Sequence, residues 1–551
     1  MKKMLLGFLL LASSTIMAQD RPITKADLLS SAKILDLQFT EPEIDSLYND
    51  VLDNVANYKA MHRLSLNNST PLSLWHSAIL PGMKFNKVQK PILWDAAVNV
   101  KLPADKNELA FYSVEQLAYL IKNKKISSIE LTTFFIERIK KYGDTLQCVI
   151  SLQENLALAQ AKQADAEIAA GKYRGQLHGI PYGLKDLFAV KDTKTTWGAA
   201  PYKDQVIQED AFVYQKMKAA GAVLVAKFTL GALAMGDYWF GGRTKNPWNL
   251  NYGSSGSSAG STSATVAGLV PFAIGTETWG SIVSPATTCG ATGLRPTFGS
   301  ISRSGAMALS YSLDKVGPIT RSANDAAIVF NYLHGTDGKD GSAVDMPFNY
   351  APKTNLKTLK IAYAKNYFDK IKDTNRSEFE VLKQFKRMGI ELIPINFPDS
   401  GVYQFNIMDI IIGAECAAQF DDMTRSGVDD ALTRQTKNDW PNQFRTSRFT
   451  PAVEYINAQR HRTILMQQVN ELVSQYDAII CPSRGGGNQS AITNLTGHPV
   501  VCVPTGLDPK YKLPTGISFV GKLFDEATIL TIAHQYQKAT GWDEMHPTMF
   551  K

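Results

Sequence analysis

The sequence has little cysteine and no pattern that would use it as a scaffold. Five of its 551 residues are cysteines, and no two of them form a CxxC pair. A chain of this length does not need disulfides, and isolated cysteines in apolar segments are usually buried small hydrophobic residues. The eight histidines show no HExxH or other paired spacing, so a zinc site has no support. The cysteines are Cys148, Cys289, Cys416, Cys481 and Cys502.

The sequence also lacks a large excess of either positive or negative charge. The chain has 58 Lys and Arg against 51 Asp and Glu, a formal net charge of +7. Basic residues occur in short groups such as KNKK at 122–125, not in the long stripes typical of nucleic-acid binders. This distribution argues against nucleic acid as a partner.

Long hydrophobic runs are missing, apart from the start of the chain. Lys2 and Lys3 precede an apolar run from Met4 to about Ala12, and small residues follow before Gln19. This is the form of a secretory signal peptide, residues 1–18, cleaved near Ala18. The run is shorter than the roughly 20 apolar residues of a membrane span. We expect an exported, periplasmic or secreted chain with no lipid anchor and no transmembrane segment in the mature chain. The mature chain would carry two fewer positive charges than the full chain, because cleavage removes Lys2 and Lys3.

The remaining composition, with 44% hydrophobic, 10% aromatic and 20% charged residues, is that of a folded soluble protein. A capping-box pattern at Thr40–Glu43 followed by apolar residues at helical spacing from Ile44 to Val55 predicts a helical amino-terminal region over 19–104. Ser113 and Gln116 suggest another helix start. We place the main domain at 105–551.

Short apolar runs bounded by Gly or Pro alternate with helical segments in this domain. The alternation predicts an α/β fold with a central, mostly buried sheet. The predicted strand segments are GAVLVAKF (221–228), LVPFAIG (269–275), KTLKIAYA (357–364), IELIPI (390–395), DAIICP (477–482), PVVCVP (499–504) and TGISFVG (515–521).

The one low-complexity segment, GSSGSSAGSTSAT at 253–265, has two interpretations. Gly/Ser tracts are commonly flexible linkers. This one is flanked on both sides by apolar and aromatic residues, which favours an embedded segment. Small residues permit close backbone approach, and a Gly-rich turn leading into a helix offers free N–H groups to a negative charge.

Ser258 lies in a G-x-S-x-G pattern, the nucleophile elbow of α/β-hydrolases. That motif requires a strand directly before the serine, and NPWNLNYGS is a poor strand sequence. It also requires a downstream histidine, and nothing distinguishes His498 from His534. We therefore do not favour this interpretation.

Three separated pieces provide another interpretation: HGIPYGLKDLF around Lys185, GSSAGS at 256–261 and GTETWGSI at 275–282. In this order they resemble the amidase signature family of serine hydrolases. NPWN at 246–249, GLRPT at 293–297, SLDKVGP at 312–318, NLTG at 494–497 and VGKLF at 520–524 also look like segments of that family, in its order. The resemblance covers about 105–547 and implies one domain with a central mixed sheet surrounded by helices.

The resemblance implies a catalytic triad. Ser281 would be the nucleophile, Ser257 the bridging serine with a cis peptide bond, and Lys185 the base. The backbone N–H groups of Thr278, Trp279, Gly280 and Ser281 would bind the oxyanion. Gly-Ser-Ser occurs twice; an ungapped register selects Ser257, and Ser254 is the runner-up.

The chemistry requires these residue types. A hydroxyl becomes nucleophilic when a base takes its proton, and a lysine can act as that base only when it is neutral. From a free pKa of about 10.4, work near pH 7 needs a shift of about 3 units, which a dry pocket can impose. The implied reaction hydrolyses a carboxamide or N-acyl amine through an acyl-enzyme, with a small-molecule amide as substrate and no metal or organic cofactor.

The chain also departs from the family pattern. Glu277 stands where Asp is frequent, Ala259 and Trp279 stand at glycine positions, and Val283 replaces a frequent arginine. The ring of Trp279 would lie near the nucleophile, and its glycine backbone geometry would be lost. The aromatic residues Tyr238, Trp239, Phe240 and Trp248 would either line an acyl pocket or belong to the core.

Two other functions stay open. One is an amidotransferase subunit, which the family also includes and which export argues against, because that work needs cytosolic tRNA and partner subunits. The other is a catalytically impaired binding protein on the same scaffold, an alternative that Trp279 supports and the intact triad opposes. The oligomeric state and the acyl and amine groups of the substrate are not determined by the sequence.

Overall fold

The computed structural model of the chain describes residues 22–64, 66–95, 97–399 and 407–551. The expected signal peptide, residues 1–18, lies outside these ranges. The chain divides into two compact units, Met1–Leu66 and Asn67–Lys551.

The described part of the first unit contains two helices, α1 (Lys25–Ile34) and α2 (Glu41–Met61). The capping box expected before α2 is present, because the backbone N–H and the hydroxyl of Thr40 donate to the Glu43 carboxylate at 2.7 and 2.8 Å. Ile44 is buried. Lys25 and Asp45 form an ion pair at 2.6 Å that links the two helices. The helix predicted from Thr40 is therefore confirmed.

The boundary between the units differs from the one predicted at 104/105. Residues 67–95 and 97–104 contain no helix or strand and belong to the second unit. Asn68 exchanges hydrogen bonds with the backbone of Ala308 at 2.8 and 2.9 Å, and Gln89 does the same with Phe348 at 2.9 Å. The segment therefore satisfies its polar groups against distant loops and extends the second unit, whereas the sequence placed it with the amino-terminal helices.

Eleven strands of the described residues form one sheet in the second unit, in the order β1-β3-β2-β8-β10-β9-β14-β15-β13-β11-β12. Their bounds are β1 (Val149–Leu152), β2 (Pro181–Lys185), β3 (Val223–Phe228), β8 (Ala273–Glu277), β9 (Thr292–Arg295), β10 (Lys315–Thr320), β11 (Ile361–Ala364), β12 (Ile393–Ile395), β13 (Ala478–Pro482), β14 (Val500–Leu507) and β15 (Pro514–Val520). The pairs β2·β3, β2·β8, β11·β12 and β11·β13 are parallel, and the others are antiparallel. The predicted mixed sheet is confirmed.

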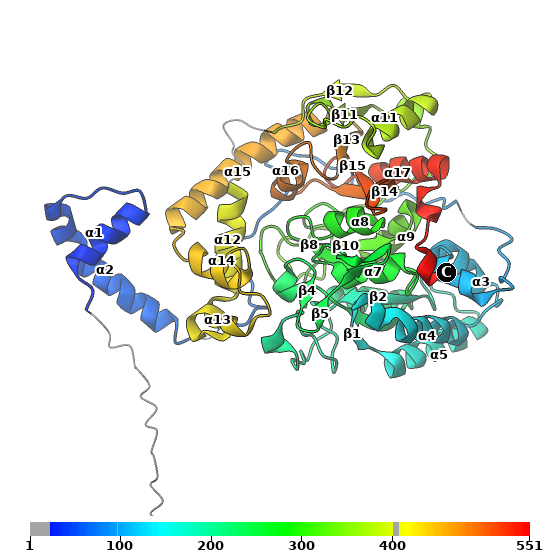
Figure 1. Cartoon of the computed structure of the whole chain (residues 1–551), viewed down its shortest axis with the longest axis horizontal. Coiled ribbons are helices and arrows are strands. Elements are labelled where there is room, and N and C mark those ends of the chain that lie inside the picture. Colours follow the sequence, from blue (N-terminus) through cyan, green and yellow to red (C-terminus); the bar gives the residue numbers. More distant parts are fainter. Residues whose placement is uncertain (1–21, 65, 96, 400–406) are drawn as a thin grey trace, which may run out of the picture. The chain divides into compact units, whose positions relative to one another are not determined.

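Two short ribbons lie outside this sheet, one formed by β4 (Tyr238–Trp239) with β5 (Gly242–Arg243) and one by β6 (Lys245–Asn246) with β7 (Asn249–Gly253). Helices surround the sheet (Figure 1). They are α3 (Val114–Lys122), α4 (Ser128–Leu146), α5 (Glu154–Ala169), α6 (Phe212–Ala220), α7 (Ala259–Val266), α8 (Val283–Cys289), α9 (Ala323–Leu333), α10 (Lys365–Phe368), α11 (Ser377–Arg387), α12 (Ile407–Gln419), α13 (Asp421–Ser426), α14 (Trp440–Ser447), α15 (Ala452–Val473), α16 (Gln489–Thr496) and α17 (Glu526–Thr540).

Short 3-10 turns complete the fold: η1 (Lys106–Phe111), η2 (Ala200–Tyr202), η3 (Ala232–Ala234), η4 (Leu356–Thr358), η5 (Val428–Ala431), η6 (Trp542–Glu544) and η7 (Thr548–Phe550). Helix α12 packs against α14 and α15, and α13 packs against α14, so that these helices form one group (yellow to orange in Figure 1). This group contributes to the site described below.

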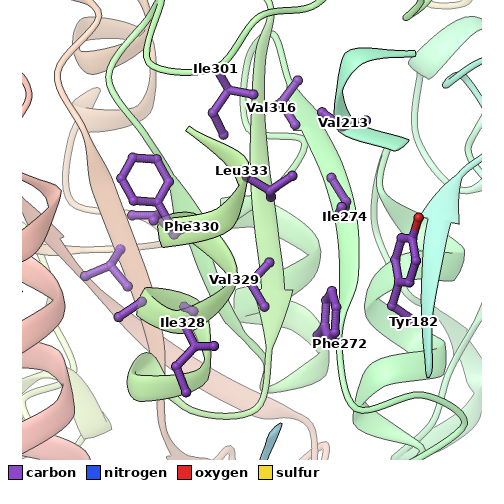
Figure 2. Close-up of a cluster of buried hydrophobic side chains, with 14 of the residues drawn as sticks. Tyr182, Val213, Phe272, Ile274, Ile301, Val316, Ile328, Val329, Phe330 and Leu333 are labelled. Atoms are coloured by element: carbon purple, nitrogen blue, oxygen red, sulfur yellow. The ribbon is translucent and has the colours of Figure 1, made fainter. Parts of the chain in front are cut away.

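The core lies between the sheet and its helices. Figure 2 shows one part of it, where side chains of α9 such as Val329 lie near Phe272, the residue before β8, Ile274 of β8 and Val316 of β10. Val316 is 2% exposed, and the other three residues are 0% exposed. A core that is buried so completely is closely packed and keeps the sheet rigid, as the precise placement of catalytic residues requires.

All five cysteines are buried and free, which agrees with the absence of a disulfide scaffold expected from the sequence. Among the described residues, no helix combines the length and the apolar character that crossing a bilayer requires.

Candidate active site

The Gly/Ser segment is not a linker. It leads into α7, whose residues are all buried. Buried hydroxyls need partners, and the helix supplies them: Thr262 donates to the carbonyl of Ser258 and Thr265 to that of Ser261, both at 2.8 Å. At Gly256 a Cβ would lie 1.9 Å from the carbonyl oxygen of Gly236, so only glycine permits this close approach. The small residues therefore serve packing at the centre of the second unit.

The structure also decides against Ser258 as an elbow nucleophile. A strand, β7, does precede it, contrary to the prediction, but β7 pairs with β6 in a separate ribbon and ends at Gly253. The Ser258 hydroxyl is fully buried, donates to the carbonyl of Thr276 at 3.0 Å and accepts from its N–H at 3.2 Å. It is thus a structural link between α7 and β8.

Lys185 is the last residue of β2, which lies between β3 and β8 in the sheet, and the residue is 0% exposed. Its Nζ atom donates to the Ser257 hydroxyl at 2.7 Å and to the Thr276 hydroxyl at 2.9 Å. Weaker contacts reach the Ser258 hydroxyl at 3.3 Å and the Thr276 carbonyl at 3.4 Å. Strand β2 therefore places the amine of Lys185 against the Gly/Ser segment, although Lys185 precedes Ser257 by 72 residues.

Burial lowers the pKa of Lys185 from 10.5 to about 7, because the charged amine loses its hydration. The negative charges of Asp314 and Glu277 act in the opposite direction and raise it. A substantial fraction of this lysine is thus neutral near pH 7, as a general base requires.

The peptide bond between Gly256 and Ser257 is cis, as the resemblance implied. Lys185 contacts Ser257 and not the runner-up Ser254, whose hydroxyl donates to the carbonyl of Ser255 at 2.8 Å. The predicted nucleophile Ser281 is 8% exposed. Its carbonyl accepts from the N–H of Ser258 at 3.1 Å, so the two segments lie side by side. Within the described residues, the Ser281 hydroxyl makes no hydrogen bond, to Ser257 or to any other group.

The turn from Thr278 to Ser281 lies between β8 and α8. None of its four backbone N–H groups donates a hydrogen bond to another described residue. Gly280 has φ = +86°, a left-handed conformation that favours glycine. Trp279 lies outside that region. The backbone of Trp279 is therefore not left-handed, as expected for a bulky residue at a glycine position, and the four N–H groups have no partner among the described residues and are candidates to bind an oxyanion.

Glu277 fixes this turn from within. One carboxylate oxygen accepts from the N–H groups of Ile282 and Val283 at 2.8 and 2.9 Å; the other accepts from Arg295 at 3.0 Å and from Asn494 at 2.8 Å. Both members of the Glu277–Arg295 ion pair are fully buried. Burial raises the pKa of Glu277, but Arg295 and these donors outweigh burial and lower it to about 2. Glu277 is therefore ionised and holds both ends of the turn.

Asp314 supports the same turn from the opposite side. Its carboxylate accepts from the Thr278 hydroxyl at 2.6 Å and from the N–H groups of Leu309 and Ser310 at 2.8 and 3.0 Å. Burial raises the pKa of Asp314 more than these donors lower it. No sequence pattern singled out Thr276 or Asp314, although Thr276 lies in GTETWGSI (275–282) and Asp314 in SLDKVGP (312–318).

Ser281 opens into a cavity of about 640 Å³, which Gly256, Thr278 and Trp279 also line; helices α12 and α14 supply part of its wall. Trp279 lines the same cavity as Ser281 and is 43% exposed. Four predicted aromatic candidates do not line this cavity: Tyr238, Trp239, Phe240 and Trp248. Trp248, for example, donates its ring N–H to the carbonyl of Cys289 at 2.8 Å and serves packing.

Within the described ranges, no group of three or more His, Cys, Asp and Glu side chains could hold a metal ion. What the site offers is a buried amine, hydroxyls and a row of backbone donors.

Comparison with known proteins supplies the family. The family model described as Amidase matches residues 130–486. A glutamyl-tRNA(Gln) amidotransferase subunit of Coxiella burnetii (strain Dugway 5J108-111) is 32% identical over 483 residues, covering 79% of this chain and 99% of the relative. The corresponding subunit of Marinomonas sp. (strain MWYL1) is 34% identical over 485 residues, covering 80% and 99%.

Among solved structures, native peptide amidase from Stenotrophomonas maltophilia superimposes with a TM-score of 0.70 at 26% identity, covering 79% of this chain and 98% of that one. The family model matches more than half of the chain, and the solved structure shares its fold. This chain belongs to the amidase signature family.

Proposed function

We propose that this chain is an exported amidase that hydrolyses a carboxamide or an N-acyl amine to a carboxylic acid and ammonia or an amine. Membership in the amidase signature family supports an enzyme that acts on amide carbon–nitrogen bonds. The observation that carries the proposal is the Lys185 amine, buried in the sheet with its Nζ atom 2.7 Å from the Ser257 hydroxyl.

The mechanism that we propose begins from the contact between Lys185 and Ser257. Neutral Lys185 accepts the proton of Ser257, Ser257 accepts the proton of Ser281, and the Ser281 oxygen attacks the amide carbon. The N–H groups of the 278–281 turn stabilise the negative charge that develops on the carbonyl oxygen. The second proton transfer requires the Ser281 hydroxyl to reach Ser257, a contact absent from the described hydrogen bonds.

The carbon–nitrogen bond then breaks, and the nitrogen leaves with a proton returned through Ser257 from Lys185. Water adds to the acyl-enzyme and loses its proton along the same relay, which releases the acid and restores Ser281. The overall reaction consumes one amide and one water and yields one acid and one amine. Every proton that the relay accepts is returned, so no other reactant is needed.

A fluorophosphonate probe tests the assignment of the nucleophile. We expect it to modify Ser281 in the wild type, to leave Ser281→Ala unlabelled, and to block amide hydrolysis. The absence of labelling in a folded wild type would favour the binding-protein alternative. Labelling that persists in Ser281→Ala would show that another residue is the nucleophile.

A second candidate is an amidotransferase subunit, because the curated relatives at 32% and 34% identity carry that name. The signal-peptide pattern at residues 1–18 argues against it, since such work needs cytosolic tRNA and partner subunits. The two candidates differ in a simple assay. The amidase should hydrolyse synthetic amides alone, whereas the subunit should use glutamine as ammonia donor and depend on its partners.

A further inference from the structure

A second cavity lies apart from the one into which Ser281 opens. It is lined by residues of α3, α9, α17 and the segment 541–546, has a volume of about 420 Å³, and shares no lining residue with the Ser281 cavity (Figure 1). A neighbouring hollow of about 370 Å³ adjoins it, since Phe111, Gln116, Glu544 and His546 line both. We call the two together the acidic groove. Its acidic side chains are Asp95, Asp105, Glu108, Glu115, Asp325, Asp543 and Glu544.

The basic side chains of the larger hollow already have partners. Arg321 donates to three backbone carbonyls at 2.7 to 3.3 Å, and Lys538 pairs with Asp95 at 3.1 Å. His534 and His546 add no positive charge at pH 7, because burial lowers their pKa to about 4 and about 3. Within the described ranges, four carboxyl groups of this hollow form no ion pair: Glu115, Asp325, Asp543 and Glu544.

Asp325 is the carboxyl group with the strongest need for a positive partner. It lies in the first turn of α9 and is 1% exposed, and both of its carboxyl oxygens are buried without a hydrogen-bond partner among the described residues. Burial raises its pKa to about 6, although the charge of Arg321 and the nearby N–H groups of Val114 and Glu115 act to lower it. A buried carboxylate without a donor is costly, so its place in the cavity lining indicates a ligand that donates hydrogen bonds and is positively charged.

Two neighbouring carboxyl groups lack a countercharge in the same way. Burial, with the charges of Asp325 and Asp95, raises the pKa of Glu115 to about 7. Burial, with the charges of Glu544 and Asp325, raises that of Asp543 to about 7. These groups repel one another when they are ionised, and a bound cation would relieve the repulsion.

The groove favours an organic cation over a metal ion. Within the part of the chain that the structure describes, no group of three or more His, Cys, Asp and Glu side chains could hold a metal ion. The ring of Phe111 lines both hollows and stacks on His546, with 4.1 Å between the ring centroids. An aromatic wall beside carboxyl groups suits an alkyl chain that ends in ammonium groups.

We propose that the acidic groove is a second binding site, which takes a small aliphatic dication with primary ammonium groups, one of them paired with Asp325. An ammonium group supplies three hydrogen-bond donors, and an alkylamine with a pKa of about 10 stays charged at neutral pH. The site lies apart from Ser281 and does not depend on the proposed amidase function.

The test measures binding of 1,4-diaminobutane to the full chain by calorimetry. At pH 8 we expect the wild type to bind it and not to bind 1,4-butanediol, the uncharged analogue. Asp325→Asn should weaken binding by about tenfold, the size expected for a hydrogen bond to a charged group. Glu115→Gln, which can still accept from Ala97 and Asn324, should weaken it several-fold. Glu391→Gln is the matched control, because it removes an exposed carboxyl group outside the groove.

The pH and the stability of the free protein provide further readouts. Protons compete with the cation for Asp325, Glu115 and Asp543, so binding to the wild type should be about tenfold weaker at pH 6 than at pH 8. The raised pKa of Asp325 means that its ionised form costs the fold stability as the pH rises through about 6. Asp325→Asn should therefore raise the Tm of the free protein at pH 8, and it should reduce the further rise that 1,4-diaminobutane gives the wild type.

Equal binding to the wild type and to both groove variants would overturn the inference, as would no binding to the wild type or tighter binding of Mg²⁺. A lower Tm of free Asp325→Asn would also overturn it, because the carboxylate would then stabilise the start of α3 without a ligand. Ser281→Ala should bind 1,4-diaminobutane as the wild type does. Failure of the proposed amidase function would therefore leave the outcome of this test unchanged.

Discussion

Lys185 determines the pH dependence of the proposed reaction. Burial favours its neutral form, while Asp314 and Glu277 favour the charged form, and the pKa of about 7 reflects this opposition. The neutral amine is the competent base, so kcat/KM should rise as the pH increases through about 7. Substitutions that change the charge around the Lys185 amine should therefore shift the pH profile of kcat/KM, even where the substituted residue does not contact the substrate.

Asp314→Asn provides that change. The substitution removes a negative charge that raises the pKa of Lys185, so the rising limb of the pH–rate profile should move to lower pH, by roughly 0.5 to 1 unit. The asparagine can still accept from Leu309 and Ser310 through its amide oxygen. A profile that stays in place, or moves to higher pH, would contradict this assignment of charge.

The choice between the two Gly-Ser-Ser pairs has its own test. Ser257→Ala should lower the rate of acylation by at least about 100-fold, because it removes the hydroxyl that lies between base and nucleophile. Ser254→Ala is the matched control, since the Ser254 hydroxyl bonds only to its neighbouring carbonyl among the described residues. Comparable losses in both variants, or a larger loss in Ser254→Ala, would favour the other register. Acylation is measured by stopped-flow with an activated ester.

The resemblance was sufficient to select Lys185, Ser257 and Ser281 from the sequence, because each stands in a motif with fixed neighbours. It did not reveal Thr276 or Asp314 as partners. Their roles depend on which face of β8 and of the loop before β10 points toward the amine, and no local pattern encodes that. For the same reason the sequence left open whether the aromatic residues from 238 to 248 line a pocket or belong to the core, since aromatic rings serve packing as readily as binding.

At the scale of elements, the link between β8 and α8 is the feature that positions the nucleophile. Glu277 ends the strand and accepts from the first N–H groups at the start of α8, while Arg295 of β9 neutralises it. Breaking a buried ion pair by removing one partner leaves the other charge uncompensated, at a cost of about 3 to 5 kcal/mol.

Glu277→Gln should therefore lower the free energy of unfolding by about 3 to 5 kcal/mol and reduce activity with it. Glu277→Asp, which restores the residue frequent in the family at this position, keeps the charge and should lose less on both counts. Urea unfolding at pH 7 measures the difference. Equal stability of Glu277→Gln and the wild type would mean that the ion pair does not support the turn.

Seven strands of the eleven-stranded sheet were predicted from apolar runs and are confirmed, whereas β1, β2, β9 and β10 were not recognised as strands. Strand β2 contains glycine and lysine, and β10 contains glycine and proline, so neither resembles an apolar β-branched run. Function explains β2, because its lysine is the proposed base. Residues 67–104 were grouped with the amino-terminal region because their long-range contacts, such as that of Gln89 with Phe348, leave no local signal.

At the scale of the whole molecule, the absence of disulfides makes a direct prediction. The five buried thiols should not react with a thiol reagent in the native protein and should all react after denaturation. A reducing agent should leave the Tm unchanged for the same reason. Native-state labelling, or a lower Tm under reduction, would show that the thiols are accessible or paired.

Export is also a property of the whole chain. We expect the secreted protein to begin at Gln19, after removal of residues 1–18, and to fold with α1 and α2 intact. Amino-terminal sequencing of protein from the extracytoplasmic fraction measures this. A mature chain that retains Met1 and stays in the cytosol would contradict export and would strengthen the amidotransferase alternative.

The most direct test of the central claim is the pH dependence of fluorophosphonate labelling in the wild type and in Lys185→Met. If the neutral amine of Lys185 activates Ser281 through Ser257, the labelling rate of the wild type rises with pH and levels off above an inflection near 7. In folded Lys185→Met the rate should fall by at least about 100-fold, and the inflection should disappear. Labelling of Lys185→Met at the wild-type rate, with the same inflection, would show that another group is the base.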